Sequence, residues 1–527
     1  MLKRLIFTLL LSVPTVIMAQ IPDSSHLPLV YINTNFQSIP NEPKVMADMR
    51  ALDNGYNQYN HITDTNFVYN GKAGIERRGS ISQLWAQKSY ALETRNPDST
   101  ARDVPLLGMP PENDWVLYAP YDDHSLMRNV ISYEIGRAMG YWAPRINYCE
   151  FILNTASPDY RGIYIVMEKI KRDSNRVRIS KLKPNENSGD DLTGGYIISI
   201  DKNIWAQDSG WTTPNPPGVF IKYVYPKAEE ITPQQKNYIR TYVDSFENAL
   251  LAPNWAHYTQ GYRKYIEPNS FIDFFIIQEL SKNIDAFKRS GYMYKDKYSK
   301  GGRLRAGPFW DFNSAWGNPK LCGFDTVGGW AHQMTCWVNS SYPVPFWWNK
   351  MLQDSVFTRD LKCRWITLRA GILDTSVLFQ KIDSIKNYIG PAAGRHFSRW
   401  QLGGTFQGDI DTLKMFIRGR IAWLDAKMPG NCWNLNTPGN PEENLQVNFY
   451  PNPFSGEIFM EQGQSIFGQT DIQIIDALGK IVFSTRFNPG TEGNKIRIPA
   501  ENLSAGIYFA MVRNGENVIS RKLVKTF

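Results

Sequence analysis

The stretch GPFWDFNSAWGN, residues 307–318, places an acidic residue among large aromatic side chains. Asp311 lies between Trp310 and Phe312, and the amide of Asn313 follows. Burying a carboxylate without a partner is costly, so a sequence that surrounds one with rings is expected to supply a cation or hydrogen-bond donors. The stretch therefore predicts a binding site at Asp311, and the elements around it indicate the fold.

The elements that precede Asp311 follow the order helix, loop, hairpin. Apolar periodicity predicts a helix over 270–282, which leads into a loop that carries Asp285. Residues 292–296 and 303–309 then read as two strands joined across a Gly-Gly pair. Asp285 and Asp311 are 26 residues apart. Protein kinases use this order, with a catalytic aspartate after a helix and a metal-binding aspartate after a hairpin.

A lysine on a strand and a glutamate on a helix form a second candidate pair. Residues 125–140 are predicted to form a helix, and Glu134 falls within its apolar face. A carboxylate on a packing face needs a cation, and Lys88, on a predicted strand, is the candidate. The pair would match the strand-lysine to helix-glutamate ion pair of protein kinases. The equal alternative is that Glu134 reaches solvent or pairs with Arg128 or Arg137.

The order of the predicted elements indicates an α+β fold class with two lobes. Strands and one helix come first, and helical periodicity dominates from about residue 233. A segment rich in Pro, Asn and Gly reads as a linker, and the alternating segments after it predict a small all-β sandwich. The predicted parts are a signal peptide at 1–19, a main domain at 26–433, the linker at 434–446 and the β domain at 447–527.

The N-terminus and the composition indicate export. Lys3 and Arg4 precede an apolar run, and the small residue Ala19 stands at the predicted cleavage point, as in a secretory signal peptide. No later segment approaches 18 apolar residues, so we expect no transmembrane segment in the mature chain. The net charge of +8 is scattered, so nucleic acid is not an expected partner.

Export permits disulfides, and the chain has five cysteines. The odd count leaves at least one thiol unpaired, and no C-x-x-C pair indicates zinc or a redox motif. Cys322 and Cys336 are close enough in sequence to close a short loop. The alternative, given equal weight, is that these cysteines are free buried thiols.

Four motifs near the C-terminus, in this order, resemble the type A C-terminal sorting domain of the type IX secretion system. They are FYPNPFSGEIF (449–459), IIDALGKIV (474–482), LSAGIYFAMV (503–512) and KLVKTF (522–527). The resemblance implies that the type IX secretion machinery is a partner. It also implies passage through the outer membrane of a Gram-negative cell after Sec export, to a secreted or cell-surface location where the sorting domain is commonly removed.

Longer motifs in the main domain resemble the CotH family of spore-coat-H-like secreted protein kinases, over roughly residues 30–320. They are GIERRGSISQLWAQKSYALE, LLGMPPENDWVLYAPYDDHSLMRNVISYEIGRAMG, RGIYIVMEKIKRDSNRVRI, GGYIISID and the stretch around Asp311. The resemblance implies an atypical, protein-kinase-like two-lobed fold. It also implies ATP and Mg²⁺ as cofactors, and phosphorylation of Ser or Thr on an exported protein substrate.

The same resemblance implies roles for particular residues. In place of a Gly-rich loop the chain has RRGSIS (77–82), which is expected to border the nucleotide. Trp310 and Phe312 are expected to exclude water from the metal. The implied site residues are Asp285, Lys88 and Glu134 for catalysis, Lys88, Glu134, Arg78 and Ser80 for nucleotide binding, and Asp311 and Asn313 for the metal.

Two other functions fit parts of the sequence. Asn313 stands where many CotH members have a second aspartate, and Ser290 stands where kinases have the catalytic-loop asparagine. These departures favour a pseudokinase that binds nucleotide or another ligand without transfer. The third interpretation is a glycoside hydrolase that uses Asp285 and Asp311 as its carboxylate pair, with tryptophans such as those in PFWWNK (345–350) as sugar platforms.

Overall fold

The chain folds into two compact units, residues 1–432 and 433–527. The computed structural model describes residues 21–203, 209–336, 341–432, 447–462, 470–476, 481–488, 495–514 and 517–526. The predicted signal peptide (1–19) and linker (434–446) lie outside the described residues. Both helices and strands are present in the first unit, so the predicted α+β class is confirmed.

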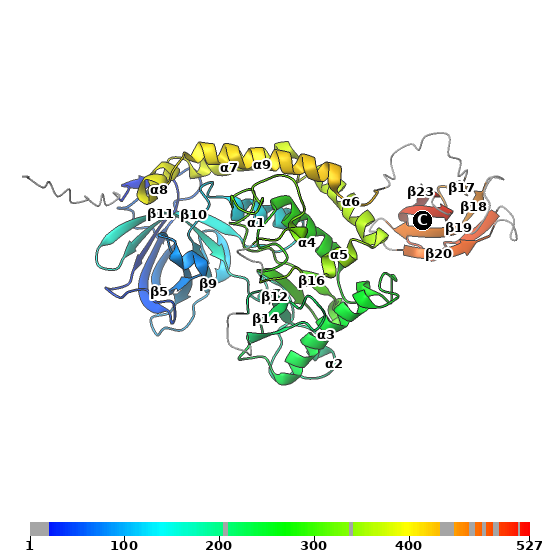
Figure 1. Ribbon diagram of the computed structural model, residues 1–527, viewed down its shortest axis with the longest axis horizontal. Helices are drawn as coiled ribbons and strands as arrows, with labels where there is room; N and C mark the ends of the chain where they lie inside the picture. The colour runs from blue at the N-terminus through cyan, green and yellow to red at the C-terminus, as the bar shows by residue number, and fades with distance from the viewer. Residues whose placement is uncertain are drawn as a thin grey trace, which may run out of the picture. The chain divides into compact units, whose positions relative to one another are not determined.

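Seven strands of the first unit close into a barrel in the order β10-β11-β9-β6-β5-β3-β2 (Figure 1). Neighbouring strands are antiparallel except β2 and β10, whose parallel pairing closes the barrel. The barrel is filled by apolar side chains such as Trp115 and Phe151. The strands are β2 (Leu29–Asn33), β3 (Val45–Leu52), β5 (Tyr69–Arg78), β6 (Ser89–Arg95), β9 (Asp114–Tyr118), β10 (Ile146–Asn154) and β11 (Pro158–Glu168).

A five-stranded antiparallel sheet follows the barrel, in the order β13-β14-β12-β15-β16. Its strands are β12 (Tyr196–Ile200), β13 (Gly210–Thr212), β14 (Phe220–Tyr225), β15 (Gly291–Lys295) and β16 (Leu304–Ala306). The predicted hairpin before Asp311 is confirmed as β15 and β16. Two short pairs also form, β1 (Ser24–Ser25) with β4 (Asn60–His61) and β7 (Val104–Leu106) with β8 (Met109–Glu112).

Helix α4 (Pro268–Ser281) is the central helix of the first unit. Of its 14 residues 12 are buried, as expected for a helix that is apolar all round. It packs against α1, α6 and α9, and Figure 1 shows α7 and α9 side by side. The other helices are α1 (Arg128–Ala138), α2 (Gly189–Leu192), α3 (Pro233–Leu251), α5 (Trp347–Met351), α6 (Ser355–Arg369), α7 (Thr375–Ile389), α8 (Ala392–Trp400) and α9 (Phe406–Lys427).

Helix α1 begins three residues later than predicted. Ser125 does not cap it; instead Asp123 accepts hydrogen bonds from the Ser125 hydroxyl at 2.5 Å and from the Arg128 N–H at 2.8 Å. The carboxylate also pairs with the Arg128 guanidinium, and both side chains are buried. Gly140, in the left-handed conformation, follows the helix end.

The second unit is all-β, as predicted. Its two sheets have the orders β17-β18-β21 and β20-β19-β22-β23. One apolar cluster contains Ile458 and Ile498 from the first sheet and Ile472 and Val512 from the second, which is the packing of a sandwich. The strands are β17 (Val447–Tyr450), β18 (Glu457–Gln462), β19 (Thr470–Asp476), β20 (Ile481–Phe487), β21 (Lys495–Pro499), β22 (Gly506–Asn514) and β23 (Asn517–Lys525).

Two disulfides form in the first unit. Cys322 pairs with Cys336, as one of the two sequence alternatives proposed, and Cys363 pairs with Cys432. Cys149 is free and buried. None of the helices in the described ranges combines the length and the apolar character that a membrane span requires.

Candidate functional site

Asp311 lies in a left-handed turn that groups from two other elements hold in place. Its φ is 70°, which a non-glycine residue keeps only where its surroundings fix it. The Phe312 N–H donates to Asn129 Oδ1 of α1 at 2.6 Å, and the Asp311 N–H lies 3.5 Å from the Tyr133 hydroxyl on the same helix. The Asp311 carbonyl accepts from Asn283 Nδ2 at 2.9 Å. Helix α1 and the loop after α4 therefore position this aspartate.

The Asp311 carboxylate lies among other carboxylates. Burial raises its pKa to about 6, and the charge of Asp285 adds to the shift. The Ser290 hydroxyl donates to Asp311 Oδ2 at 3.0 Å and opposes the rise in pKa, whereas Asp122 and Asp201 increase it. In the part of the chain that the structure describes, no basic side chain forms an ion pair with Asp311. The Asp311 carboxylate thus lies in a region of negative charge and has no ion-pair partner of its own among the described residues.

The side chains present fit a divalent cation. Mg²⁺ is a hard cation that binds oxygen atoms, usually through one or two carboxylates, with waters and substrate phosphates as its other ligands. Asp122 was not predicted; it lies beside the predicted ligand Asn313, whose Nδ2 donates to Asp122 Oδ2 at 2.7 Å. Burial raises the pKa of Asp122, and the Asn313 hydrogen bond opposes the rise. Among the described residues, no three His, Cys, Asp or Glu side chains form a ready metal-binding group.

Asp285 lies in the turn that follows α4, as predicted. Its N–H donates to Asn283 Oδ1 at 3.1 Å, so Asn283 contacts the backbones of both Asp285 and Asp311. The Asp285 carboxylate forms an ion pair with Arg289, whose guanidinium also lies over the Tyr342 ring. The structure thus brings the two predicted aspartates into one site and links them through a buried amide.

Arg78, the last residue of β5, reaches the same site, whereas Ser80, in the loop that follows, is exposed. The Arg78 guanidinium lies 5.3 Å from the centre of the Trp310 ring, next to Asp311. Burial and the Asp311 charge raise the pKa of Tyr133, and Arg78 opposes that shift, which places its charge nearby. Ser80 Oγ accepts from Lys202 Nζ at 3.4 Å. The RRGSIS loop therefore adds positive charge beside the carboxylates.

The predicted ion pair between Lys88 and Glu134 does not form. Lys88 Nζ donates to the carbonyl oxygens of Gln83, at 2.7 Å, and Trp85, and so closes the loop that contains η1 (Ile81–Leu84). Glu134 pairs with Lys381 of α7 at 2.8 Å. Helix α7 covers the side of α1 that carries Glu134. The partner of Glu134 is therefore Lys381, 247 residues later in the chain, and not Lys88.

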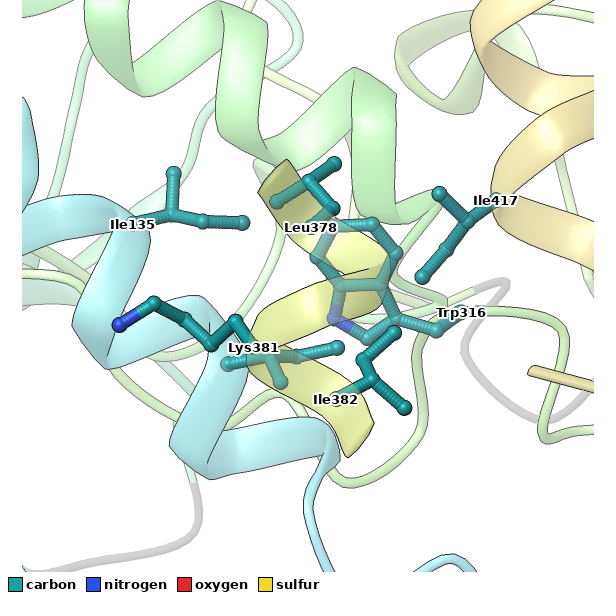
Figure 2. A pocket seen from close by; sticks show the side chains of 7 residues that line it. Ile135, Trp316, Leu378, Lys381, Ile382 and Ile417 are labelled. Atoms are coloured by element: carbon teal, nitrogen blue, oxygen red, sulfur yellow. The ribbon is translucent and has the colours of Figure 1, made fainter. Parts of the chain in front are cut away.

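Lys381, the partner of Glu134, lines a small apolar cavity (Figure 2). The cavity, of about 10 Å³, has room for at most one water molecule, so it is not a ligand site. Its lining comes from α1, α7, α9 and the loop after Asp311, and consists of Ile131, Ile135, Trp316, Leu378, Lys381, Ile382 and Ile417.

We expect a double-mutant cycle to couple Glu134 with Lys381 and not with Lys88. The pair is partly exposed, with Lys381 45% and Glu134 23% accessible, so the coupling free energy should be about 0.5 kcal/mol. The measurement is urea unfolding of Glu134→Gln, Lys381→Met and the double variant, with Lys88→Met as the matched alternative partner. A larger coupling to Lys88 would contradict the arrangement described.

The pH dependence of stability tests the environment of Asp311. An unfolded aspartate ionises near pH 4, whereas burial raises the pKa of folded Asp311 to about 6. Between these values the folded state keeps the proton that the unfolded state has lost, so the free energy of unfolding should fall as the pH rises, by about 3 kcal/mol at most. Urea unfolding of wild type and Asp311→Asn from pH 4 to 7, in a chelator, measures this. Parallel profiles for the two proteins would reject the raised pKa.

A larger polar depression, of about 410 Å³, lies at the other end of α4 from Asp285. Two of its basic side chains already have acidic partners: Arg263 pairs with Asp354 at 2.5 Å and Arg303 with Glu267 at 2.6 Å. The depression contains none of the predicted site residues, so the candidate site remains the cluster around Asp311.

The fold and the site define an α+β protein whose acidic site is bordered by Arg78 of the RRGSIS loop. Comparison with protein families identifies the class. The family described as CotH kinase protein matches residues 75–424, and that described as secretion system C-terminal sorting domain matches residues 448–526. The first match covers about two thirds of the chain, so this chain belongs to the CotH kinase protein family. The second confirms the predicted type IX sorting domain, which indicates a secreted or cell-surface location. No curated protein matches the chain.

Proposed function

We propose that this protein is a secreted protein kinase that transfers the γ-phosphate of ATP, in the presence of Mg²⁺, to Ser or Thr of exported proteins. The observation that carries the proposal is the meeting of Arg78, Asp285 and Asp311 at one site whose carboxylates outnumber its cations. An arginine beside a cluster of oxygen ligands complements a metal-bound triphosphate. Membership of the CotH kinase protein family supports the same chemistry.

Each side chain has a defined task in this proposal. Asp311, with Asp122 and Asn313, would hold Mg²⁺, and Arg78 would bind phosphate oxygens through its guanidinium. Mg²⁺, when bound, offsets the phosphate charge during transfer. Asp285 would accept the proton of the acceptor hydroxyl at a carboxylate oxygen. Asn283 would keep the two aspartates at a fixed separation.

The proposed architecture is a two-lobed, kinase-like domain. The barrel, with the loop at the end of β5, would be the nucleotide-covering lobe, and the second sheet with its helices would carry the two aspartates. Lys88 would then act by holding the loop around η1 through its carbonyl oxygens, since it has no ion pair with Glu134 here.

A nucleotide-binding pseudokinase is the second candidate. The Asp285–Arg289 ion pair favours it, because the carboxylate of the proposed base is already engaged by a guanidinium. A glycoside hydrolase has less support, because Trp347 and Trp348 of the PFWWNK segment are only 0% and 3% exposed and pack in the core. They cannot serve as an open sugar platform.

Thermal unfolding with ATP and Mg²⁺ tests the proposal and uses a matched pair of arginines. Ligand at a hundred times its dissociation constant should stabilise the protein by about 2.7 kcal/mol. Arg78→Ala should weaken ATP binding about 10- to 100-fold, because a charged hydrogen-bond donor is lost. Arg77→Ala is the control, since the neighbouring Arg77 is exposed. No stabilisation of wild type, or equal losses in the two variants, would count against the proposal.

A further inference from the structure

A disulfide-closed loop contacts the last turn of helix α4, which leads into the turn that carries Asp285. The segment that follows Asp311 contains Cys322 and Cys336, which are 14 residues apart and joined by a disulfide. We name residues 322–336 the clamp loop. A short covalent ring of this kind has far fewer open conformations than the free chain.

Lys282 fastens the clamp loop to the end of α4. Its Nζ donates to the carbonyl oxygens of Gly323 at 2.7 Å, Thr326 at 2.7 Å and Gly328 at 2.5 Å, and to Thr326 Oγ1 at 3.0 Å. The side chain is fully buried. A buried ammonium requires acceptors already in place, so these contacts depend on the closed shape of the loop.

A second set of contacts, from Arg420 and Glu279, also holds the clamp loop. Arg420 of α9 donates through Nη1 to the carbonyl oxygens of Val327 and Gly329, each at 2.7 Å. Glu279 of α4 accepts from the N–H groups of Ala331 at 2.7 Å and His332 at 3.0 Å. The loop is therefore fixed to the last turn of α4 and not merely packed beside it.

The same last turn positions the catalytic aspartates. Lys282 is the left-handed cap of α4, with a φ of 47°, and Asn283 follows it directly. Asn283 accepts from the Asp285 N–H and donates to the Asp311 carbonyl. The clamp loop is thus linked to both aspartates through the adjacent residues Lys282 and Asn283.

We propose that Lys282 is a positioning residue, through which the Cys322–Cys336 disulfide sets the geometry of the Asp285 turn. This inference rests on the proposed phosphate transfer. It implies that the enzyme is fully active only after Cys322 and Cys336 have been oxidised to the disulfide. In the oxidation, a disulfide-bearing oxidant of the export compartment takes two electrons and two protons from the two thiols. One S–S bond forms in the loop, and the oxidant leaves as two thiols. Before export, the reduced clamp loop would leave the Asp285 turn loosely held.

The test compares two disulfides in the full-length protein. Cys322→Ser/Cys336→Ser opens the clamp loop, and Cys363→Ser/Cys432→Ser removes the other disulfide as a matched control. Hydrogen exchange at the Asp285 and Ala286 amides, both bonded to Asn283, is the first measurement. It should rise on the order of tenfold in the first variant and not in the control. In phosphate transfer, kcat should fall about tenfold or more with the KM for ATP nearly unchanged.

Further outcomes separate this inference from the proposed function. Lys282→Met, checked for folding by circular dichroism, should reproduce the exchange and kcat effects, and adding dithiothreitol to it should have little further effect. Unchanged exchange in the Cys322/Cys336 variant, or an equal rise in the control, would overturn the inference. Faster exchange in that variant, with no transfer by oxidised wild type, would uphold the clamp and reject the kinase.

Discussion

Asp311→Asn is expected to abolish Mg²⁺-dependent ATP binding and phosphate transfer together. The amide is nearly isosteric and retains an oxygen that can accept from Ser290, so the turn should survive. It lacks the charge that holds the metal at the phosphates. Loss of that charge should raise the activation free energy of transfer by several kcal/mol, which lowers the transfer rate by a factor on the order of 10³ or more.

Isothermal titration with ATP, with and without Mg²⁺, measures the binding half of this prediction. Asp411→Asn is the control, since Asp411 is an exposed residue of α9 that accepts one surface hydrogen bond from Gln407. It should bind ATP like wild type. Tight Mg²⁺-dependent binding by Asp311→Asn would show that the metal lies elsewhere.

Asp285→Asn is expected to separate binding from chemistry. ATP and Mg²⁺ should bind nearly as in wild type, because Asp285 is assigned to the acceptor hydroxyl and not to the phosphates. Transfer should slow by a factor on the order of 10²–10⁴, which is typical of a lost general base. Single-turnover phosphate transfer at saturating ATP measures the chemical step directly.

The Asp285 substitution also removes the ion pair with Arg289, so a second variant must separate the two effects. Arg289→Gln breaks the pair and keeps the carboxylate. We expect its transfer rate to fall much less than that of Asp285→Asn. Equal rates in the two variants would mean that the ion pair, and not proton transfer, accounts for the loss.

The sequence was sufficient for the elements that carry local signals. The periodic helix before Asp285, the β15–β16 hairpin and the all-β second unit lie where their patterns predict them. The predicted start of α1 was wrong, because the Asp123 carboxylate accepts hydrogen bonds from both Ser125 and Arg128 and so takes the capping role. Parallel pairing of β2 with β10 was not predicted, since nothing local in either strand specifies a partner so far along the chain.

The site was predicted less completely because its polar partners are distant in sequence. The pairing of Glu134 with Lys381 depends on α7 packing against α1, which no pattern in either helix reveals. Asp122 looks like one more acidic residue before a helix until Asn313 is found beside it. Asn283 is two residues before Asp285, but its link to Asp311 appears only when the turn after α4 meets the turn after β16.

Transfer of labelled phosphate from ATP to a Ser/Thr-rich exported protein, by the oxidised full-length chain, tests the central claim most directly. The reaction is run with Mg²⁺ or with a chelator, beside Asp311→Asn, and the labelled residue is identified by mass spectrometry. The proposed function predicts label on Ser or Thr with wild type and Mg²⁺ only. Binding of ATP without any transfer would instead identify a pseudokinase, and equal labelling by Asp311→Asn would contradict the assignment of the site.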